Sequence, residues 1–486
     1  MAIVLKESYG VDSFCALVAT RESLEFLKEQ TDIPYTSLIL DEDLHAAYVH
    51  EKVDHAYIDM LEKEYGIPNL WPYLMSDRIL MKGQFLREYP YDHPPYTHDE
   101  LLRILQANAR GIISFLEQEK PDMIFFSVVG NLASHLLYAI AKKKGIRVQV
   151  GELGRFPEQY MVYEDYQNFK EVRERFNELI QGTSIQDNVR IEKARALVED
   201  FRARPRPYAQ SDSILKQDMT RMQHLKFLSP IRFLRSVYWL VRRIKDYATY
   251  PKENNYTSIN PFYYFVDKIK RKARIFRGYE DLYDEIDLQE NFVYFPLNYE
   301  PEISLFLYAP FHSDQAHLVK QVARSLPVGY TLYVKEHPTM VGYRPRSFYH
   351  EIKKMPNVKL IRPHTLSFTL LEHTKLVTTI TGTGGWEALL FKKPSITFGY
   401  NFYNSAPMVK HSTAIDELPY LIDQQLHHFT YNEEHLLLFI SAVLEHTADI
   451  DMVHLWHDSP PLPAMEQGVA PLVDLLARNL GLTRLS

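Results

Sequence analysis

Residues 123–150 read MIFFSVVGNLASHLLYAIAKKKGIRVQV. The apolar, aromatic run Met123 to Val129 predicts a buried strand, and Gly130-Asn131 predicts a turn after it. Leu132 to Lys144 has the period of an amphipathic helix that ends at a glycine, and Ile146 to Val150 predicts a second strand. A strand, a helix and a strand at this spacing form a βαβ unit around a parallel sheet, so the stretch predicts an α/β fold.

The same alternation runs through the rest of the chain. Before this unit, residues 35–40 predict a strand and 101–119 a helix. After it, strands are predicted at 304–309, 331–335, 358–361, 376–380 and 395–398, and helices at 315–325, 346–354, 367–373 and 386–391. Short apolar strands joined by helical crossovers indicate a doubly wound parallel sheet. Helical periodicity at 432–445 and 469–480 indicates a helical tail.

The chain is long enough for more than one hydrophobic core. Its 486 residues exceed the size that a single core usually serves. We expect an N-terminal Rossmann-like domain over residues 1–205, a helical insertion over 206–290, and a C-terminal Rossmann-like domain with the tail over 291–486. Pro205 and Pro207 mark the first boundary.

The expected insertion is strongly basic. The whole chain has a formal net charge of −7, but Thr220 to Arg277 contains 14 Lys or Arg residues against three acids, with large apolar side chains between them. We expect this block to hold the protein against an anionic membrane surface. The alternative is a solvated linker whose charges pair with acids elsewhere. No recognised nucleic-acid motif accompanies the charge, so no nucleic-acid partner is expected.

Composition excludes several classes of protein. Hydrophobic residues make up 46% and charged residues 24%, as in folded soluble proteins rather than disordered chains. The single cysteine, Cys15, rules out an intrachain disulfide and a cysteine-based metal site. The first residues lack the basic-then-apolar order of an export signal, and no apolar run reaches the length of a bilayer crossing. These features predict a cytoplasmic protein.

Neither a metal site nor a cofactor is expected from the remaining ligand types. The late histidines, from His427 to His457, have no metal-ligand spacing. The acidic run Asp41-Glu42-Asp43 follows the predicted strand 35–40, and we interpret it as a solvated loop rather than a cation site.

A first candidate site follows the predicted strand 331–335. The sequence Lys335-Glu336-His337-Pro338 leaves the sheet at the carboxyl end of this strand, the edge at which open α/β sheets bind ligands. Lys335 offers a positive charge, and His337 offers a hydrogen bond or a charge to a phosphate oxygen. The alternative is a surface turn shaped by Pro338.

A second candidate site is a glycine- and threonine-rich loop after the predicted strand 376–380. It contains Thr381, Gly382, Thr383 and Gly384, and Glu387 follows in the first turn of the predicted helix. Backbone N–H groups at such a helix start bind anions, and a carboxylate there can accept two ribose hydroxyls. The alternative is a capping loop in which Glu387 complements the helix dipole. The loop fits neither the dinucleotide-binding nor the P-loop pattern.

Two further carboxylates complete the set of candidate residues. Glu302 ends a proline-shaped segment that we expect at the hinge between the domains. Glu152 follows the predicted strand 146–150, at the equivalent edge of the N-terminal sheet. From these positions both carboxylates can face a ligand bound between the domains. The alternatives are a linker with solvated acids and a loop closed by Glu152 and Arg155.

The order of these segments resembles a known family. The motifs Phe295-Pro296-Leu297 with Pro301-Glu302, Lys335-Glu336-His337-Pro338, and Thr381-Gly382-Thr383-Gly384 with Glu387 look like those of the bacterial capsule polysaccharide biosynthesis proteins, over about residues 292–405. Several members of that family are Kdo transferases that use CMP-Kdo. The His-Pro pair with a later small-residue loop is also similar to bacterial sialyltransferases that use CMP-sialic acid. Asn298 stands where the family pattern has His, and over residues 1–290 the resemblance is architectural only.

This resemblance implies a glycosyltransferase with two Rossmann-like domains facing a cleft, the GT-B arrangement, which needs no metal. It implies that Lys335, His337 and the loop 381–385 bind the phosphate of a nucleotide sugar, CMP-linked, and that Glu387 binds its ribose or base. The acceptor, a glycan or glycolipid, would lie against the N-terminal domain. There Glu152 is the expected catalytic base, and His337 is expected to act in catalysis on the donor side.

Two other functions fit the same architecture. One is a non-hydrolysing UDP-sugar epimerase, which needs no acceptor. The other is a non-catalytic scaffold of a polysaccharide assembly complex, which predicts no nucleotide binding.

Overall fold

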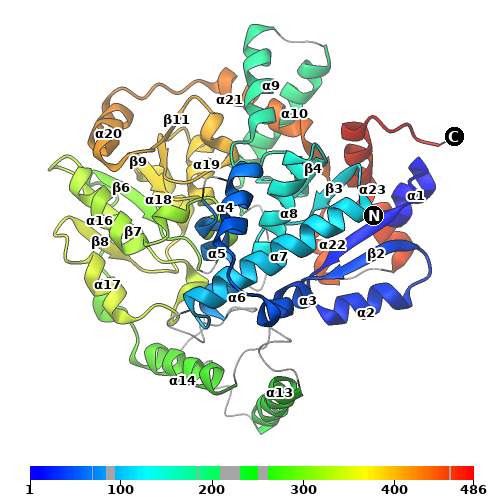
Figure 1. Ribbon diagram of the computed structural model, residues 1–486. Coiled ribbons are helices and arrows are strands. Elements are labelled where there is room, and N and C mark those ends of the chain that lie inside the picture. Colours follow the sequence, from blue (N-terminus) through cyan, green and yellow to red (C-terminus); the bar gives the residue numbers. More distant parts are fainter. Residues whose placement is uncertain are drawn as a thin grey trace.

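The computed structural model shows an α/β protein with a C-terminal parallel sheet and smaller N-terminal sheets (Figure 1). It describes residues 1–67, 69–83, 94–182, 185–207, 230–249, 261–300, 302–458 and 461–485. Within these ranges no helix has both the length and the apolar composition required to cross a lipid bilayer.

Six parallel strands form the C-terminal sheet. In chain order they are β6 (Phe292–Pro296), β7 (Thr331–Lys335), β8 (Val358–Ile361), β9 (Leu376–Thr379), β10 (Ser395–Thr397) and β11 (Val409–His411). Their order across the sheet is β11-β10-β9-β6-β7-β8, and each neighbouring pair is parallel. The expected doubly wound sheet is therefore confirmed, and its winding reverses between β6 and β9.

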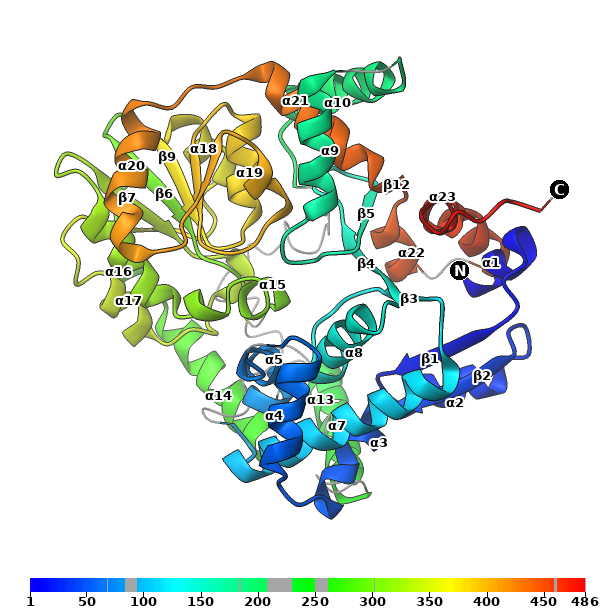
Figure 2. The ribbon, with the colours of Figure 1, turned by 45° about the horizontal axis from the view of Figure 1, so that its top comes forward.

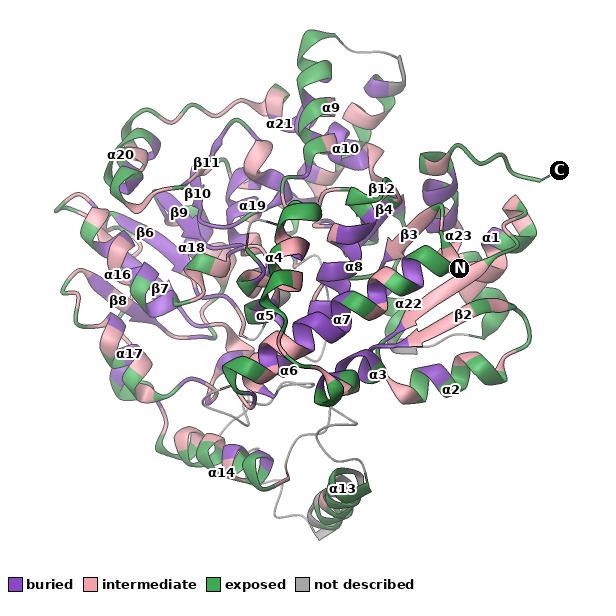
Figure 3. Cartoon of the chain, viewed as in Figure 1, coloured by how far each residue is buried: buried purple, intermediate pink, exposed green. Residues whose placement is uncertain are grey.

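Helices cover the two faces of this sheet (Figure 2). On one face lie α16 (Gln315–Ser325), α17 (Arg346–Ile352) and α20 (Leu418–His427), and on the other lie α18 (Ser367–His373) and α19 (Thr383–Leu390). Side chains alternate between the faces along β6. Val293 and Phe295 pack into the first core, and Phe292 and Tyr294 into the second. The sheet is accordingly buried on both sides (Figure 3).

Two strand predictions in this half need correction. Residues 304–309 do not form a strand, because the Glu302 carbonyl accepts the N–H groups of Leu305 and Phe306 and starts the short helix α15 (Ile303–Phe306). The first strand is instead β6, whose last residues, Phe295 and Pro296, we had placed in the segment at the interdomain hinge. Pro296 is the last residue of the strand, a position at which the missing N–H does little harm.

The N-terminal half carries its strands in two sheets. β1 (Phe14–Val18) and β2 (Tyr35–Leu40) form a parallel pair, while β3 (Met123–Phe126), β4 (Arg147–Leu153) and β5 (Gln159–Tyr163) belong to a second sheet. β3 and β4 are parallel and joined by α8 (Leu132–Lys143), so the predicted βαβ unit is confirmed. The other helices of this half are α1 (Ala2–Tyr9), α2 (Arg21–Glu29), α3 (Asp41–Ala46), α4 (His55–Glu64), α5 (Trp71–Ser76), α6 (Arg78–Lys82), α7 (His98–Glu119), α9 (Lys170–Gln181) and α10 (Ile185–Ala203).

The C-terminal tail returns to this N-terminal half. It comprises α21 (Glu433–Glu445), β12 (Thr447–Asp449), α22 (Met452–Asp458) and α23 (Leu462–Leu480). α21 packs against α9 and α10, β12 pairs antiparallel with β5, and α23 packs against α1. We had expected the tail to accompany the C-terminal domain. Its apolar residues instead complete the N-terminal cores, so the chain crosses between the halves more than once.

The basic insertion is helical where the structure describes it. α13 (Pro230–Thr249) and α14 (Pro261–Arg277) lie at one end of the molecule (Figure 1). The rest of the expected basic block, residues 208–229 and 250–260, lies outside the described residues. The domain limits at residues 205 and 290 stay predictions.

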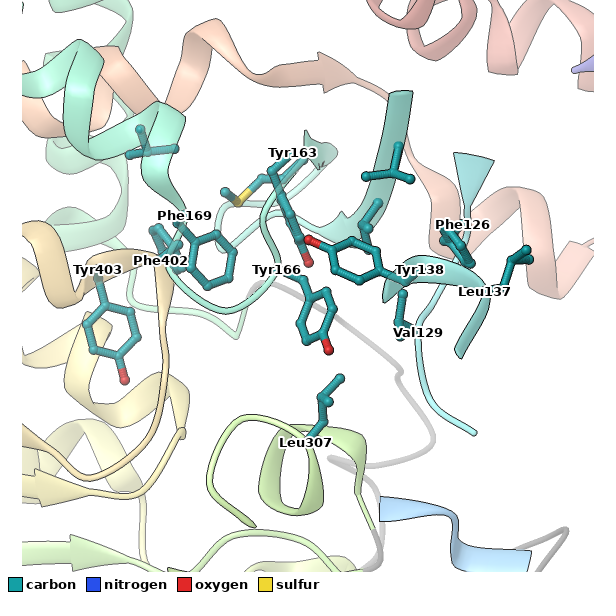
Figure 4. Close-up of a cluster of buried hydrophobic side chains, with 14 of the residues drawn as sticks. Phe126, Val129, Leu137, Tyr138, Tyr163, Tyr166, Phe169, Leu307, Phe402 and Tyr403 are labelled. Atoms are coloured by element: carbon teal, nitrogen blue, oxygen red, sulfur yellow. The ribbon is translucent and has the colours of Figure 1, made fainter. Parts of the chain in front are cut away.

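Aromatic side chains join the two halves. Tyr163 and Phe169 of the N-terminal half share one buried cluster with Leu307, Phe402 and Tyr403 of the C-terminal half (Figure 4). The rings of Phe169 and Phe402 lie 6.4 Å apart, edge to face. This shared core fixes the carboxyl edge of the C-terminal sheet against strands β4 and β5.

Candidate functional site

Side chains from β6 and β9 meet where the winding of the sheet reverses. Asn298, two residues after β6, is 6% exposed, and its Nδ2 donates a hydrogen bond to Oγ1 of Thr381, two residues after β9, at 2.9 Å. In the part of the chain that the structure describes, Oδ1 of Asn298 has no hydrogen-bond partner. A buried oxygen without a donor is rare, and ligands of doubly wound sheets bind at this reversal. We call the ends of β6, β7 and β9 with the start of α19 the switch-point edge.

Close backbone contacts shape the loop between β9 and α19. Gly382 donates its N–H to Oγ1 of Thr379 at 3.1 Å, and its carbonyl accepts the hydroxyl of Tyr403 at 2.6 Å. A β-carbon would lie 2.7 Å from Thr379 Oγ1 at Gly382, and 2.8 Å from the Tyr403 hydroxyl at Gly385, so both positions need glycine. Helix α19 begins at Thr383, and the first N–H groups of a helix attract anions. The loop has the geometry of an anion site.

Lys335 and Glu387 interact electrostatically at this edge. Lys335, the last residue of β7, is buried and donates from Nζ to Oγ of Ser367 at 3.1 Å. Burial lowers the pKa of Lys335 to about 8, while the charges of Glu336 and Glu387 act to raise it. Burial raises the pKa of Glu387 to about 7, opposed by the charge of Lys335 and a hydrogen bond with Thr383. Both groups therefore titrate close to neutral pH.

The position of Glu387 differs from the expected one. We had placed it in the first turn of a helix that begins at Trp386, but α19 begins at Thr383 and Glu387 lies one turn inside it. The dipole of a helix acts within its first turn. The capping interpretation of Glu387 is therefore weakened, and its partner is the buried ammonium of Lys335.

A buried ion pair fixes the chain after β7. Both carboxylate oxygens of Glu336 accept hydrogen bonds from Nη1 of Arg344, and Oε2 also accepts the hydroxyl of Tyr349 at 2.8 Å. Nη2 of Arg344 donates to the backbone carbonyl of Asn298 at 2.7 Å. Arg344 thus connects the end of β7 to the end of β6, and both charges are almost completely buried.

His337 is held in the turn that follows. It is the N-cap of the short 3-10 helix Pro338–Met340, and its Nδ1 accepts the N–H of Thr339 at 3.3 Å. Its ring lies edge-on to Tyr299, with centroids 5.7 Å apart. Because Nδ1 serves the turn, a ligand at this position would be met by Nε2. The structure shows the turn that we gave as the alternative, and it leaves the phosphate-binding role of His337 a prediction.

On the N-terminal side, Glu152 has two charged or polar partners. The hydroxyl of Tyr163 donates to its Oε2 at 2.8 Å, and the guanidinium of Arg155 donates to its Oε1. We expected Glu152 in a loop after the strand, but β4 continues to Leu153, and Glu152 pairs with Met161 of β5. The hairpin β4–β5 therefore holds this carboxylate on a rigid element.

Two tyrosines connect Glu152 with the C-terminal half of the chain. The hydroxyls of Tyr163 and Tyr308 lie 3.5 Å apart, and burial raises the pKa of Tyr308, which the charges of Glu152 and Glu302 raise further. Both candidate carboxylates thus lie near the same phenol.

Tyr403 makes the second connection. Burial raises the pKa of Tyr403, the charge of Arg155 from the other half of the chain lowers it, and Glu387 raises it. Tyr403 therefore contacts the loop 381–385 through the Gly382 carbonyl, while its own phenol is affected by charges from both halves of the chain.

The acidic run after β2 is not the solvated loop that we expected. Asp41 and Glu42 are buried at the start of α3, and only Asp43 is exposed, where it pairs with Arg21 at 2.8 Å. Oδ2 of Asp41 accepts a hydrogen bond from Nδ2 of Asn131, the N-cap of α8, at 2.5 Å. These groups consolidate the N-terminal half. Among the described residues no three His, Cys, Asp or Glu side chains are placed to hold a metal ion together.

The structure thus brings most of the predicted residues to one edge. Lys335, Thr381, Gly382, Thr383, Gly384 and Glu387 lie around the start of α19, and the charges of Glu152 and Glu302 both act on the Tyr308 phenol. Motif reading did not identify Arg344, Tyr308 or Tyr403. The bonds that make them important join segments 21 to 145 residues apart, so no local spacing signals them. Chemically, the edge combines a buried cation, a carboxylate of raised pKa and a helix start, which suits a nucleotide phosphate and ribose.

Comparisons with known proteins agree with the motifs at this edge. Residues 204–426 match the model of a family described as capsule polysaccharide biosynthesis protein, which confirms the resemblance that the sequence indicates. The matched segment includes α13, α14 and all six strands of the C-terminal sheet. No curated protein matches the chain by sequence.

Several solved structures resemble the fold at low sequence identity. One is KpsC of Thermosulfurimonas dismutans, a beta Kdo 2,7 transferase, with 12% identity, 76% of this chain and 89% of that chain covered, and a TM-score of 0.37. Another is the beta Kdo 2,4 transferase of the same organism's KpsC, with 14% identity, 73% and 86% covered, and a TM-score of 0.31. A third is UDP-GlcNAc 2-epimerase from Neisseria meningitidis, with 12% identity, 96% and 99% covered, and a TM-score of 0.26.

Proposed function

We propose that this chain, which carries a capsule polysaccharide biosynthesis segment at residues 204–426, is a glycosyltransferase of the GT-B type that uses a nucleotide-activated sugar. One observation carries the proposal: the buried Lys335 and the partly buried Glu387 interact beside a glycine-rich helix start, at the reversal of a doubly wound sheet. Taking a cation and a carboxylate out of water costs folding free energy, so such a pair at a ligand-binding edge is better explained by binding than by stability. Phosphate and ribose binding is such a purpose.

In this proposal the donor lies across the switch-point edge. The ammonium of Lys335 and the first N–H groups of α19 bind the phosphate, with Thr381, Gly382, Thr383 and Gly384 forming the wall around it. Glu387 accepts the ribose hydroxyls, and His337 reaches a phosphate oxygen through Nε2. The donor we propose is CMP-linked, as in the transferases that the motifs resemble.

The proposed chemical step uses residues from both halves of the chain. Glu152 takes the proton of the acceptor hydroxyl while that oxygen bonds to the anomeric carbon, and the bond from this carbon to the phosphate oxygen breaks. The departing nucleotide carries the electron pair of the broken bond as negative charge. Lys335, His337 and the dipole of α19 stabilise that charge, so metal independence is part of the proposal. Glu302 orients the acceptor, a glycan or a lipid-linked glycan presented at a membrane.

Nucleotide binding tests the donor site. Purified protein is heated with CMP, UDP or GDP, since a ligand that binds only the native state raises the melting temperature. We expect CMP to give the largest shift. Lys335→Met removes one charge-assisted hydrogen bond and should weaken CMP about ten- to hundredfold. Lys375→Met, at the exposed amino end of β9, is the matched control and should bind CMP like the parent.

Transfer tests the catalytic assignment. With a CMP-sugar and an acceptor, the parent should release CMP, while Glu152→Gln should bind CMP normally and release it at least a hundredfold more slowly. Parental turnover in Glu152→Gln would remove Glu152 as the base. Interconversion of UDP-sugar epimers without an acceptor would replace the proposal by an epimerase, and absence of any nucleotide shift would favour a scaffold.

A further inference from the structure

Helices α13 and α14 both present apolar stripes to the solvent. On α13 the side chains of Ile231, Leu234, Tyr238 and Val241 are each between 58 and 72% exposed. Their spacing of three, four and three residues places them along one face of the helix. Figure 3 shows α13 as mostly exposed where it is described, away from the main body. Single exposed apolar residues are common, but a continuous stripe marks an interaction surface.

α14 shows the same arrangement together with a firm attachment. Its inner face holds Tyr264 and Asp267, both buried, and Arg274, which donates to the carbonyl of Tyr343. Its outer face holds Phe262, Phe265, Ile269 and Phe276, which are between 51 and 77% exposed. The helix is thus fixed to the C-terminal half on one side and presents aromatic rings on the other.

The two helices touch through residues that lie off both stripes. The ring of Trp239 on α13 lies 4.3 Å from that of Tyr264 on α14, and Nζ of Lys268 lies 5.0 Å from the Trp239 ring. The contact therefore leaves the apolar faces uncovered. The two helices therefore do not pack through their apolar stripes.

The charge on these helices selects the partner. Their 37 residues contain eleven Lys or Arg and two Asp, and Asp267 is paired with Arg271 at 2.8 Å. Arg235, Arg242, Lys245, Lys268, Lys270, Lys272 and Arg277 are exposed. A second copy would bring the same positive charge against this surface and be repelled. Nucleic acid would satisfy the cations but leave the apolar stripes in water, whereas an anionic lipid surface satisfies both.

We propose that α13 and α14 lie in the plane of an anionic membrane, with the stripes Ile231–Val241 and Phe262–Phe276 buried among the acyl chains. The cations flanking the stripes contact the lipid phosphates, in the manner of an interfacial amphipathic helix. The attachment of α14 to residues 342–344 holds the switch-point edge at a fixed height above the lipid, because Arg344 joins that segment to β6 and β7. This surface is independent of the donor-site assignment.

Vesicle sedimentation of the full chain tests the proposal. The probes are vesicles of phosphatidylcholine alone and of phosphatidylcholine with about one third phosphatidylglycerol. We expect the parent to sediment with the anionic vesicles only. Phe276→Ser and Leu234→Ser should each weaken this binding several-fold, and together by more than tenfold. Tyr420→Ser is the matched control, since Tyr420 is 78% exposed against 77% for Phe276 but lies on α20.

Charge variants complete the test. Arg242→Glu with Lys272→Glu should lower binding at least tenfold, because each basic residue near an anionic surface adds about 1 kcal/mol. Lys375→Glu, elsewhere on the surface, should not. A parent that stays in the supernatant at low salt, or that sediments equally with neutral vesicles, overturns the proposal. Binding to anionic vesicles that is unchanged in the Phe276→Ser and Leu234→Ser variants also overturns it. So does self-association of the parent without vesicles that these variants lose.

A second measurement reports on the surface itself. The only cysteine, Cys15, allows Phe276→Cys to be labelled with an environment-sensitive dye in a Cys15→Ser background. Blue-shifted emission on anionic vesicles, absent for a label at Tyr420→Cys, supports burial of the stripe, and an unchanged spectrum contradicts it. CMP binding measured in each variant without vesicles separates failure of this proposal from failure of the donor site.

Discussion

Nδ2 of Asn298 donates a hydrogen bond to Oγ1 of Thr381 across the reversal of the C-terminal sheet, at 2.9 Å. The two residues are 83 positions apart in the chain, yet each lies two residues beyond the end of its strand, on neighbouring strands β6 and β9. The bond closes the sheet edge at the point where a ligand of a doubly wound fold binds. It also orients the Asn298 Oδ1 toward Gly382, where a β-carbon would lie 3.9 Å from it.

Exchanging one atom of Asn298 tests its place in the donor site. Asn298→Asp keeps the shape but turns the donor into an acceptor and adds a negative charge beside the proposed phosphate. We expect CMP affinity to fall at least tenfold by isothermal titration. Asn291→Asp makes the same exchange at the exposed opposite end of β6 and should leave affinity unchanged. Equal affinity in both variants would place Asn298 outside the donor site.

The pair Lys335 and Glu387 predicts an optimum for nucleotide binding. The Glu387 carboxyl, with a pKa of about 7, is ionised above that pH, and the Lys335 ammonium, with a pKa of about 8, is charged below that pH. CMP affinity should therefore be highest between these values and fall on both sides. Glu387→Gln should remove the acidic limb. It should also move the alkaline limb to lower pH, because the Glu387 charge raises the pKa of Lys335. An affinity that does not change between pH 6 and pH 9 contradicts this pairing.

The same two groups predict how stability depends on pH. The pKa of Glu387 is raised from 4.5 to about 7 on folding, so its contribution to the free energy of unfolding is present below pH 4.5 and lost as pH rises to 7. The pKa of Lys335 is lowered from 10.5 to about 8, so its contribution is present above pH 10.5 and lost as pH falls to 8. The difference in the free energy of urea unfolding between Glu387→Gln and the parent, measured from pH 4 to pH 8, should show the contribution of Glu387 alone. A pH-independent difference would mean that Glu387 has an ordinary pKa in the folded protein.

Local patterns were sufficient for the elements but not for the contacts between them. The βαβ unit at residues 123–150 is confirmed because each of its parts carries its own signal: an apolar run, a helical period and a glycine stop. The start of α19 was placed three residues late, because Thr383, Gly384 and Gly385 have low helix propensity and are held by tertiary contacts to Tyr403 and Thr379. β6 was missed because its last residues, Phe295 and Pro296, were assigned to the proline-shaped segment at the interdomain hinge.

The candidate site divides in the same way. Lys335, the loop 381–384 and Glu387 were found because they directly follow strands, where the fold gathers ligands. Tyr308, Tyr403 and Arg344 were not found, since their importance comes from bonds that bridge distant segments. The burial that shifts the pKa values of Lys335 and Glu387 is likewise a property of the packed sheet and has no local signature.

Glycine at position 385 should be required for the loop. A β-carbon there would lie 2.8 Å from the Tyr403 hydroxyl and 3.0 Å from Thr379 Cγ2, so Gly385→Ala must displace the ring that holds the Gly382 carbonyl. We expect a loss of about 1–3 kcal/mol in the free energy of unfolding and weaker CMP binding. Gly329→Ala, which has no atom within 4 Å of the new carbon, should be close to neutral. A Gly385→Ala protein as stable as Gly329→Ala would contradict the close packing at this position.

The buried pair of Glu336 and Arg344 gives the last prediction. Among the described residues, Arg344→Ala leaves the buried Glu336 carboxylate with the Tyr349 hydroxyl and the His337 N–H as donors, and it leaves the Asn298 carbonyl with the Gln315 side-chain amide as its one donor. Removing one partner of a buried ion pair typically costs 3–5 kcal/mol, so we expect a loss of about that size in urea unfolding. Arg362→Ala, which breaks exposed pairs with Glu280 and Glu285, should leave the unfolding curve close to that of the parent.

Replacing both partners separates stability from function in this pair. Glu336→Leu with Arg344→Met removes the two charges together, and such apolar replacements often recover most of the lost stability. The Glu336 charge, however, raises the pKa of Lys335, so its removal should lower that pKa further. We expect the double variant to fold stably but to lose CMP affinity at a lower pH than the parent on the alkaline side. If the alkaline limb stays in place, Glu336 acts only as a structural partner of Arg344 and does not tune the phosphate-binding lysine.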